Sequence, residues 1–357
     1  MTPTPPTESA PAIAEGSVFL SRLRIATYVI ILVWLSIVLL EKFRDVLQPF
    51  FIALFIGFMM HPVHRWLVRR GIPSMIAYGL ILVVVALSVF AFGTLVYANI
   101  TQVTENLDSY EQRLERRILN VRARLPIETP ELEGRFLRKV FASDQLLAAT
   151  RTALGRFGDF TSLAVLTFFY LLFLIAEKVS FPRRVTLAFG TERGESIMGV
   201  FETINQAMGE YVAVKTFASM MAGFFSYVVL ALFGVEFAAT WGILIFLLNY
   251  IPYIGSLIAV TVPIVLSFVQ FDEVWKCGAI TVALIGVQQL IGNWIEPRMT
   301  GQRLDVSPLL ILLALAFWGT VWGIIGMILA VPLLVIVKIV LDNIPETKPI
   351  ATLISNR

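Results

Sequence analysis

Residues Phe237 to Phe271 read FAATWGILIFLLNYIPYIGSLIAVTVPIVLSFVQF, and this segment contains no charged residue. A helix needs about 20 apolar residues to cross the hydrocarbon core of a membrane, so the segment is too long for one straight span. The sequence Asn249-Tyr250-Ile251-Pro252-Tyr253-Ile254-Gly255 interrupts it near its middle. We therefore predict a helical hairpin at membrane depth with its tip near Pro252. One long tilted helix is the alternative.

The composition of the whole chain indicates a membrane protein. Of its 357 residues, 57% are apolar and 15% are charged, whereas soluble domains have about 45–50% and about 25%. This balance excludes a disordered or collagen-like chain. The net charge of +3 comes without a clustered basic face, so we predict no nucleic-acid partner. The single cysteine, Cys277, disfavours a zinc site, and we predict no metal and no cofactor.

Six other apolar segments are each predicted to form one span, and they are Ile25–Leu40, Val46–Met60, Ser74–Ala98, Phe160–Ala176, Thr216–Gly234 and Val274–Ile295. A second overlong segment, Pro308–Leu341, contains Gly319, Gly323, Gly326 and Pro332. It predicts a second broken hairpin; close helix packing is the plainer interpretation of its glycines. We thus predict an all-α polytopic membrane protein with about six spanning helices, two re-entrant helical hairpins and an extracytoplasmic helical insert.

Lysine and arginine residues predict the orientation of these spans. They follow the second span, the fourth span and Ile295, and such residues concentrate in cytoplasmic loops. Both termini are then cytoplasmic, and the hairpins enter from opposite faces, as in transporters with inverted repeats. The predicted units are a disordered cytoplasmic tail (1–20), scaffold helices (21–98), the outer helical insert (99–159), a membrane helix (160–177), a cytoplasmic amphipathic segment (178–215), a transport domain (216–341) and a cytoplasmic tail (342–357).

The first hairpin tip is one candidate binding site. Pro252 removes a backbone donor and frees a carbonyl upstream, and Gly255 permits a close backbone turn. Together with the amide of Asn249, these groups could bind a solute without carrying charge. The alternative is a proline kink that packs against neighbouring helices.

A second candidate lies in the span that ends at Ile295. Gln289, Asn293 and Glu296 are spaced i, i+4 and i+7, which predicts one shared helix face. Three polar groups on a membrane helix should face the protein interior or an aqueous path. Hydrogen bonding between helices is the alternative. A carboxylate at this depth needs a charged partner, for which we expect Arg298 or Arg303.

The same residues resemble a known family of bacterial permeases, the AI-2E family. Leu232-Phe233-Gly234-Val235 followed by Leu248-Asn249-Tyr250-Ile251-Pro252-Tyr253-Ile254-Gly255 is similar to the signature of its first half. The second half is matched by Gln288-Gln289, Asn293, Glu296-Pro297, Gly301, Ser307-Pro308, Gly323, Gly326 and Pro332. The resemblance implies substrate-binding roles for Asn249, Pro252, Gly255, Gln289, Asn293 and Glu296, and structural or hinge roles for Pro297 and Gly301. For Gly323, Gly326 and Pro332 we predict structural or hinge roles from the interruption of the second overlong segment.

The resemblance also implies a transporter, and not an enzyme, in the bacterial inner membrane. The family is named for export of the quorum-sensing signal autoinducer-2, which is small, uncharged and rich in hydroxyls, and other members are described as sodium(lithium)/proton antiporters. Homo-oligomers, a pentamer among them, are implied. The first hypothesis is therefore elevator-like export of a small polar solute across the lipid bilayer. The second is a sodium(lithium)/proton antiporter that uses Glu296, and the third is a scaffold or regulator whose outer insert binds a partner.

Overall fold

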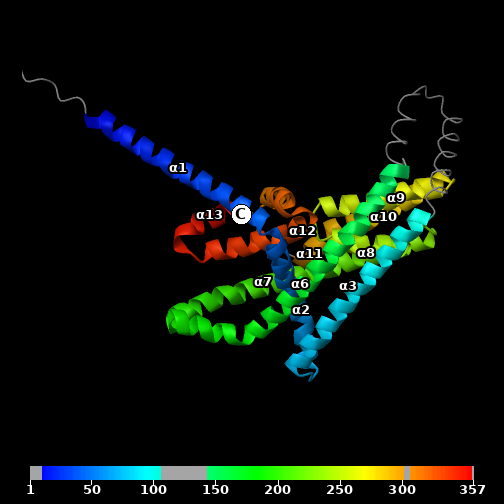
Figure 1. Ribbon diagram of the computed structural model, residues 1–357, viewed down its shortest axis with the longest axis horizontal. Helices are drawn as coiled ribbons and strands as arrows, with labels where there is room; N and C mark the ends of the chain where they lie inside the picture. The colour runs from blue at the N-terminus through cyan, green and yellow to red at the C-terminus, as the bar shows by residue number, and fades with distance from the viewer. Residues whose placement is uncertain (1–9, 106–142, 301–305, 356–357) are drawn as a thin grey trace, which may run out of the picture.

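The computed structural model describes residues 10–105, 143–300 and 306–355, and within these ranges the chain is helical and contains no strand (Figure 1). Seven of the described helices are long and apolar enough to cross a membrane. These observations confirm the prediction of an all-α polytopic membrane protein. The elements are α1 (Ala10–Lys42), α2 (Arg44–Arg69), α3 (Ser74–Glu105), α6 (Ser143–Phe189), α7 (Thr191–Leu232), α8 (Ala238–Leu248), α9 (Ile254–Gln270), α10 (Val274–Leu290), a π-helix (Ile291–Ile295), α11 (Glu296–Thr300), α12 (Pro308–Asp342), a short 3-10 helix (Pro345–Thr347) and α13 (Lys348–Ile354).

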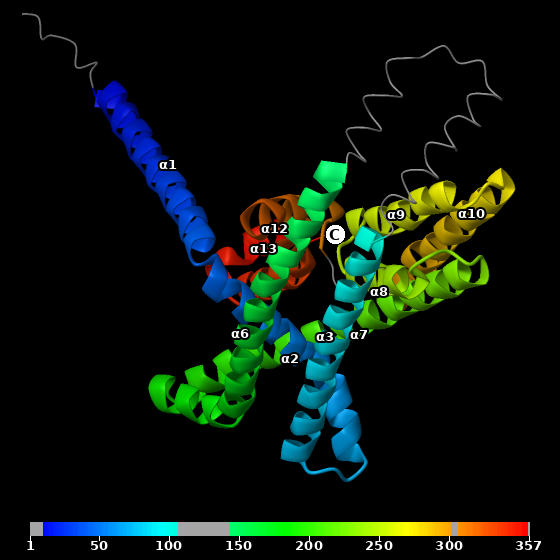
Figure 2. The same cartoon turned by 45° about the vertical axis from the view of Figure 1, so that its right-hand side comes forward.

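Helix α1 begins at Ala10, inside the segment predicted as a disordered tail, so that prediction is wrong for residues 10–20. Between residues 23 and 36 the helix is exposed on all sides. Figures 1 and 2 show it projecting from the body formed by the other helices. Because its exposed faces are apolar, this part of α1 suits contact with lipid or with another membrane helix.

Two long helices in the middle of the chain, α6 and α7, run across the predicted unit boundaries. Helix α6 continues without a break from the end of the predicted insert, through the fourth span, to Phe189. Gly190, with φ of 79°, separates it from α7. Residues 178–215 are therefore no separate segment, and α7 leads directly into the fifth span as one continuous helix. Most of the predicted insert, residues 106–142, lies outside the described residues.

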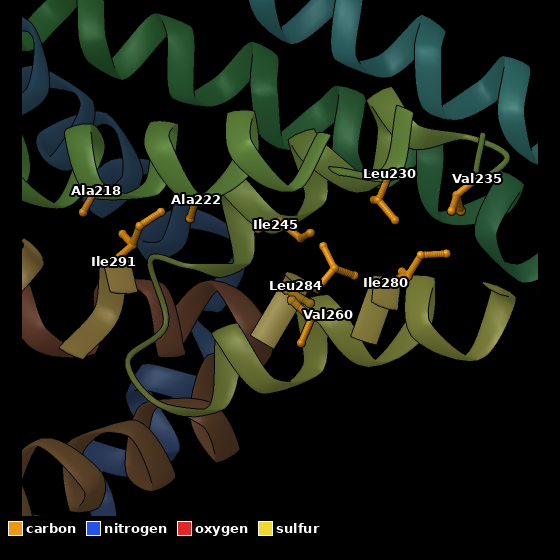
Figure 3. Packing of buried hydrophobic residues seen from close by; sticks show 10 residues of the cluster. Ala218, Ala222, Leu230, Val235, Ile245, Val260, Ile280, Leu284 and Ile291 are labelled. Atoms are coloured by element: carbon orange, nitrogen blue, oxygen red, sulfur yellow. The ribbon is translucent and has the colours of Figure 1, made fainter. Parts of the chain in front are cut away.

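Helices α7 to α10 share one apolar core (Figure 3). Glycine residues bring α7 and α8 very close together, since a Cβ atom on Gly223 would lie 2.6 Å from the carbonyl oxygen of Gly242. The core is formed by buried residues of all four helices and of the π-helix, including Ala218, Ala222, Leu230, Ile245, Val260, Ile280, Leu284 and Ile291.

Both overlong segments are broken. The alternative, one long tilted helix in each segment, is therefore wrong. The first consists of α8 and α9, which pack against each other and are joined by Asn249–Tyr253. The second, α12, has a non-helical residue at Gly323, with φ of 65° and ψ of −145°. A Cβ atom on Gly326 would lie 2.0 Å from the carbonyl oxygen of Trp318, so the chain folds back on itself at this point. We call α8–α9 the first hairpin and α12 the second hairpin.

Candidate functional site

The tip of the first hairpin is shaped by one unusual residue and one glycine. Tyr253 has a φ of 62°, a left-handed value that reverses the chain direction between the two helices. Gly255 then passes so close to the end of α8 that a Cβ atom would lie 1.8 Å from the carbonyl oxygen of Leu248. The predicted role of Gly255 as a close backbone turn is thereby confirmed. Pro252 lies between these residues and is half-buried.

Two side chains at this tip donate hydrogen bonds to hydroxyl groups of α7. The Nδ2 group of the buried Asn249 donates to Oγ of Ser219 over 3.0 Å. The phenol of Tyr250 donates to Oγ1 of Thr216 over 2.8 Å. Thr216 and Ser219 are three residues apart and so lie on one face of α7. The tip therefore presents amide and hydroxyl groups inside the helical body.

The second candidate site is joined to the same face of α7 by an ion pair. Nζ of Lys215 lies 2.6 Å from Oε1 of Glu296. The Lys215 side chain is 6% exposed and that of Glu296 is 22% exposed. Arg298, one of the two expected partners, instead stacks over the ring of Trp294, 3.4 Å from its centroid. Arg303 lies outside the described residues.

The predicted shared face of Gln289, Asn293 and Glu296 is wrong. Residues 291–295 form a π-helix, which adds about one residue to a helical turn and rotates everything that follows it. Glu296 consequently points toward α7, whereas Gln289 and Asn293 are exposed on the surface and are hydrogen-bonded to each other. In the single chain, the amides of Gln289 and Asn293 therefore do not lie in the protein interior. That they lie beside an aqueous path stays a prediction.

The predicted hinge residues separate into three groups. Gly323 forms the exposed tip of the second hairpin, and Gly326 allows its two arms to pack closely. Pro332 lies buried within the second arm and away from the break, so its hinge role is not supported by its position. Pro297 is exposed at the start of α11, and Gly301 lies outside the described residues.

The second hairpin tip is bonded to the N-terminal helices. Nε2 of the buried Gln48 in α2 donates to the carbonyl oxygen of Trp322 over 2.9 Å. Nε1 of Trp322 donates in turn to the carbonyl oxygen of Leu40 near the end of α1, over 3.1 Å. The ring of Trp322 also lies beside that of Phe51, with 5.5 Å between their centroids. Three residues of α1 and α2 therefore hold this tip.

The two hairpins meet in a small apolar cluster. Ile251 and Leu248 of the first hairpin pack with Leu315 and Ala330, one from each arm of the second hairpin. Tyr250 also makes an edge-to-face contact with Phe55 of α2, with 5.9 Å between the centroids. The buried part of the first tip, Asn249 to Ile251, is consequently packed against α2, α7 and the second hairpin, whereas Tyr253 is exposed.

Sequence reasoning missed the residues that link these parts. Lys215, Thr216 and Ser219 were assigned to the end of a charged segment and to a plain span, and Gln48 was taken as part of a span. One signal was present: Lys215, Thr216 and Ser219 fall at i, i+1 and i+4 in one helix, which places polar groups along a single face. The partners of that face depend on tertiary packing and could not be read from spacing.

An all-helical membrane body with two broken hairpins, one of them bonded to a polar face of α7, indicates a multi-span transport protein. A family model described as AI-2E family transporter matches residues 25–346, and the chain belongs to this family. A candidate transport protein of Borreliella burgdorferi is 31% identical over 324 residues, which are 90% of this chain and 88% of the relative. The candidate transport protein YhhT of Escherichia coli is 28% identical, covering 93% of each chain. The AI-2 transport protein TqsA of Escherichia coli is 26% identical, covering 92% of this chain and 95% of the relative.

Proposed function

We propose that this transporter is an inner-membrane carrier that exports a small polar solute such as autoinducer-2. The observation that carries the proposal is the buried, uncharged polar tip of the first hairpin, where Asn249, Tyr250, Thr216 and Ser219 lie together. Amide and hydroxyl groups can exchange hydrogen bonds with a hydroxyl-rich neutral molecule, each contributing about 1 kcal/mol net. The name of TqsA supports the same class of substrate.

In this proposal the solute contacts Asn249, Pro252 and Gly255 at the first tip, while Gln289 and Asn293 line an aqueous approach. Movement of the hairpin relative to a fixed scaffold exposes the site to one face of the membrane and then to the other, in an elevator-like cycle. The proposed arrangement has cytoplasmic termini and a homo-oligomeric assembly. It is supported by family membership and by the broken hairpins.

The direct test is flux of autoinducer-2 through proteoliposomes that contain the purified protein. We expect Asn249→Leu to lower the flux about tenfold or more, since the loss of one or two hydrogen bonds costs about 1.4 kcal/mol or more. Asn343→Leu is the matched control, because Asn343 is exposed at the end of α12 and donates only locally, to the carbonyl of Ile339. Equal flux in the two variants would reject the proposed site. No flux in the parent protein would reject the proposed substrate.

The antiporter hypothesis requires that Glu296 bind a sodium ion or a proton, although this residue already forms an ion pair with Lys215. A sodium ion or proton must compete with the Lys215 ammonium for the Glu296 carboxylate, because that carboxylate is already neutralised. Glu296→Gln separates the two functions. An antiporter loses sodium-dependent proton movement in this variant, measured with a pH-sensitive dye inside the vesicles. A carrier of a neutral solute keeps its solute flux.

A further inference from the structure

The hydrogen bonds that hold the two hairpin tips connect them to different parts of the molecule. The first tip is bonded to α7 through Ser219 and Thr216. The second tip is bonded to α1 and α2 through Leu40 and Gln48. Both hairpins fall in residues 216–341, the segment predicted as one transport domain. Since their tips are bonded to different helices, the two hairpins need not move as one unit.

The first hairpin is joined to α7 through its α8 arm, and to the α7–α8 loop through the end of α9. At its base, Gln270 of α9 accepts a hydrogen bond from the backbone N–H of Glu236 over 2.9 Å and donates to the carbonyl oxygen of Gly234 over 2.8 Å. At its middle, Gly223 and Gly242 bring α7 and α8 into close contact. Beyond α10, Glu296 at the start of α11 is paired with Lys215 of α7. Helices α7 to α11, residues 191–300, thus form one bonded group, which we name the carrier unit.

The second hairpin shares its packing with α1 and α2. Trp322 and Val321 are buried in a cluster that also contains Leu40, Leu47 and Phe51 of the N-terminal helices. The Trp322 carbonyl directly precedes the break at Gly323, where a regular helix bond is lost, and Gln48 supplies a donor to it. We name α1, α2 and the second hairpin the frame.

The contacts described between the carrier unit and the frame are apolar. They include the cluster of Ile251 and Leu248 with Leu315 and Ala330, and the ring contact of Tyr250 with Phe55. A larger buried cluster also joins the two groups, and it consists of Met208, Tyr211 and Val212 of α7, Phe58 of α2, and Val331 and Val335 of the second hairpin. Each side-chain hydrogen bond named above stays within one of the two groups. Apolar contacts are non-directional, so two surfaces of this kind can slide without a fixed register. Gly190, with its positive φ, lies at the junction where the carrier unit begins.

We infer that the second hairpin stays with α1 and α2 while the carrier unit moves past it, and that Gln48 and Trp322 are the positioning residues that hold the hairpin tip on the frame. The inference rests on the proposed transport function and divides the segment 216–341 between a moving and a static part. The first hairpin then acts as the mobile half of the site, and the second hairpin as the fixed surface that the solute passes.

Distance measurements between pairs of spin labels in lipid nanodiscs test this division without a known substrate. Cys277→Ser removes the single cysteine of the chain and keeps a donor for the Ser267 carbonyl. Labels are then placed at exposed side chains in three pairs: 46 with 324 within the frame, 257 with 282 within the carrier unit, and 257 with 324 between them. We expect single narrow distance distributions for the first two pairs and a broad or two-peaked distribution for the third.

A narrow 257–324 distribution together with a broad 46–324 distribution would overturn the inference, because the second hairpin would then travel with the first. Three narrow distributions would overturn it as well, by showing one rigid body. Autoinducer-2 flux in the same preparation separates this result from failure of the proposed function. A broad 257–324 distance without flux rejects the substrate and leaves the inference standing.

The positioning residues have their own variants. Gln48→Leu removes the donor to the Trp322 carbonyl, and we expect the 46–324 distribution to broaden while 257–282 stays narrow. Trp322→Phe removes the indole N–H and reduces the size of the buried ring while it keeps an aromatic side chain in place, so it serves if Gln48→Leu does not fold. Gln206→Leu, an exposed change in α7, is the matched control and should alter none of the distances. An unchanged 46–324 distribution in both Gln48→Leu and Trp322→Phe would overturn the role of these two residues.

Discussion

The ammonium group of Lys215 and the carboxylate of Glu296 lie 2.6 Å apart, where the surrounding helices exclude most of the solvent. A charge removed from water is costly unless a partner of opposite charge stays with it. The two residues are 81 positions apart in the chain. The pair therefore joins the start of α11 to the middle of α7 and adds a contact that depends on both charges to the apolar packing of α10 on α7.

Replacing one member of this pair should destabilise the protein strongly. We expect Lys215→Met to lower the free energy of unfolding by about 3 kcal/mol, because Glu296 is left without its lysine partner. The double variant Lys215→Met with Glu296→Gln should recover most of that loss. Thermal unfolding of the detergent-solubilised protein, followed by intrinsic tryptophan fluorescence, measures both. Equal midpoints for the single and double variants would show that the two charges are not coupled.

Gly255 should tolerate no side chain. Gly255→Ala places a Cβ atom 1.8 Å from the carbonyl oxygen of Leu248, and backbone atoms cannot yield as a flexible side chain can. We expect a large fall in the yield of folded protein, read as the monodisperse fraction in size-exclusion chromatography. Gly278→Ala in α10 is the matched control, since nothing lies within 4 Å of the added atom. There the same change should be neutral or stabilising by up to about 1 kcal/mol.

At the scale of elements, the π-helix at residues 291–295 directs Glu296 toward α7. Deletion of Gly292 removes the extra residue of this turn and should restore an α-helical register. Five residues of a π-helix cover about the same rotation as four residues of an α-helix, so Glu296 should still face Lys215 after the deletion. We therefore expect Glu296→Gln to destabilise the deletion variant about as much as it destabilises the parent protein. No further loss from Glu296→Gln in that background would contradict this account of the π-helix.

The two breaks could be predicted from sequence because their causes are local. Pro252, Gly255 and Gly323 alter the backbone whatever packs around them, and excess length showed that a break was needed. The π-helix could not be predicted, because its five residues, Ile291–Ile295, carry no proline and only one glycine. The contacts of Lys215 and Gln48 could not be predicted either, since they join segments far apart in the chain. The polar residues in the apolar segments indicated where a candidate site lies. The residues that contact them depend on tertiary packing and could not be predicted from the sequence.

At the scale of the whole molecule, the order of the spanning helices predicts on which side of the membrane each loop lies. The loop before α3 and the loop before α10 are separated by α3, α6, α7 and the first hairpin. If the hairpin returns to the side from which it entered, these loops lie on opposite faces of the membrane. Lysine and arginine bias predicts the loop before α3 to be cytoplasmic.

Cysteine labelling tests this arrangement in the Cys277→Ser background. We expect Glu273→Cys to react with a membrane-impermeant maleimide in intact cells from which an outer membrane has been stripped. Met75→Cys, which is 88% exposed at the start of α3, should react only after the cells are opened. Both positions are exposed in the structure, so a lack of reaction reports the membrane barrier. Reaction of both cysteines from the same side would reject the predicted topology.

The ion pair between α7 and the end of α10 also decides how the protein responds to the electrical potential of the membrane. Moving one elementary charge through 100 mV requires about 2.3 kcal/mol. Lys215 and Glu296 both belong to the carrier unit, so their opposite charges travel together and the pair does no net electrical work. Any voltage dependence of a carrier loaded with a neutral solute must therefore come from the other charged residues of 191–300, and not from this pair.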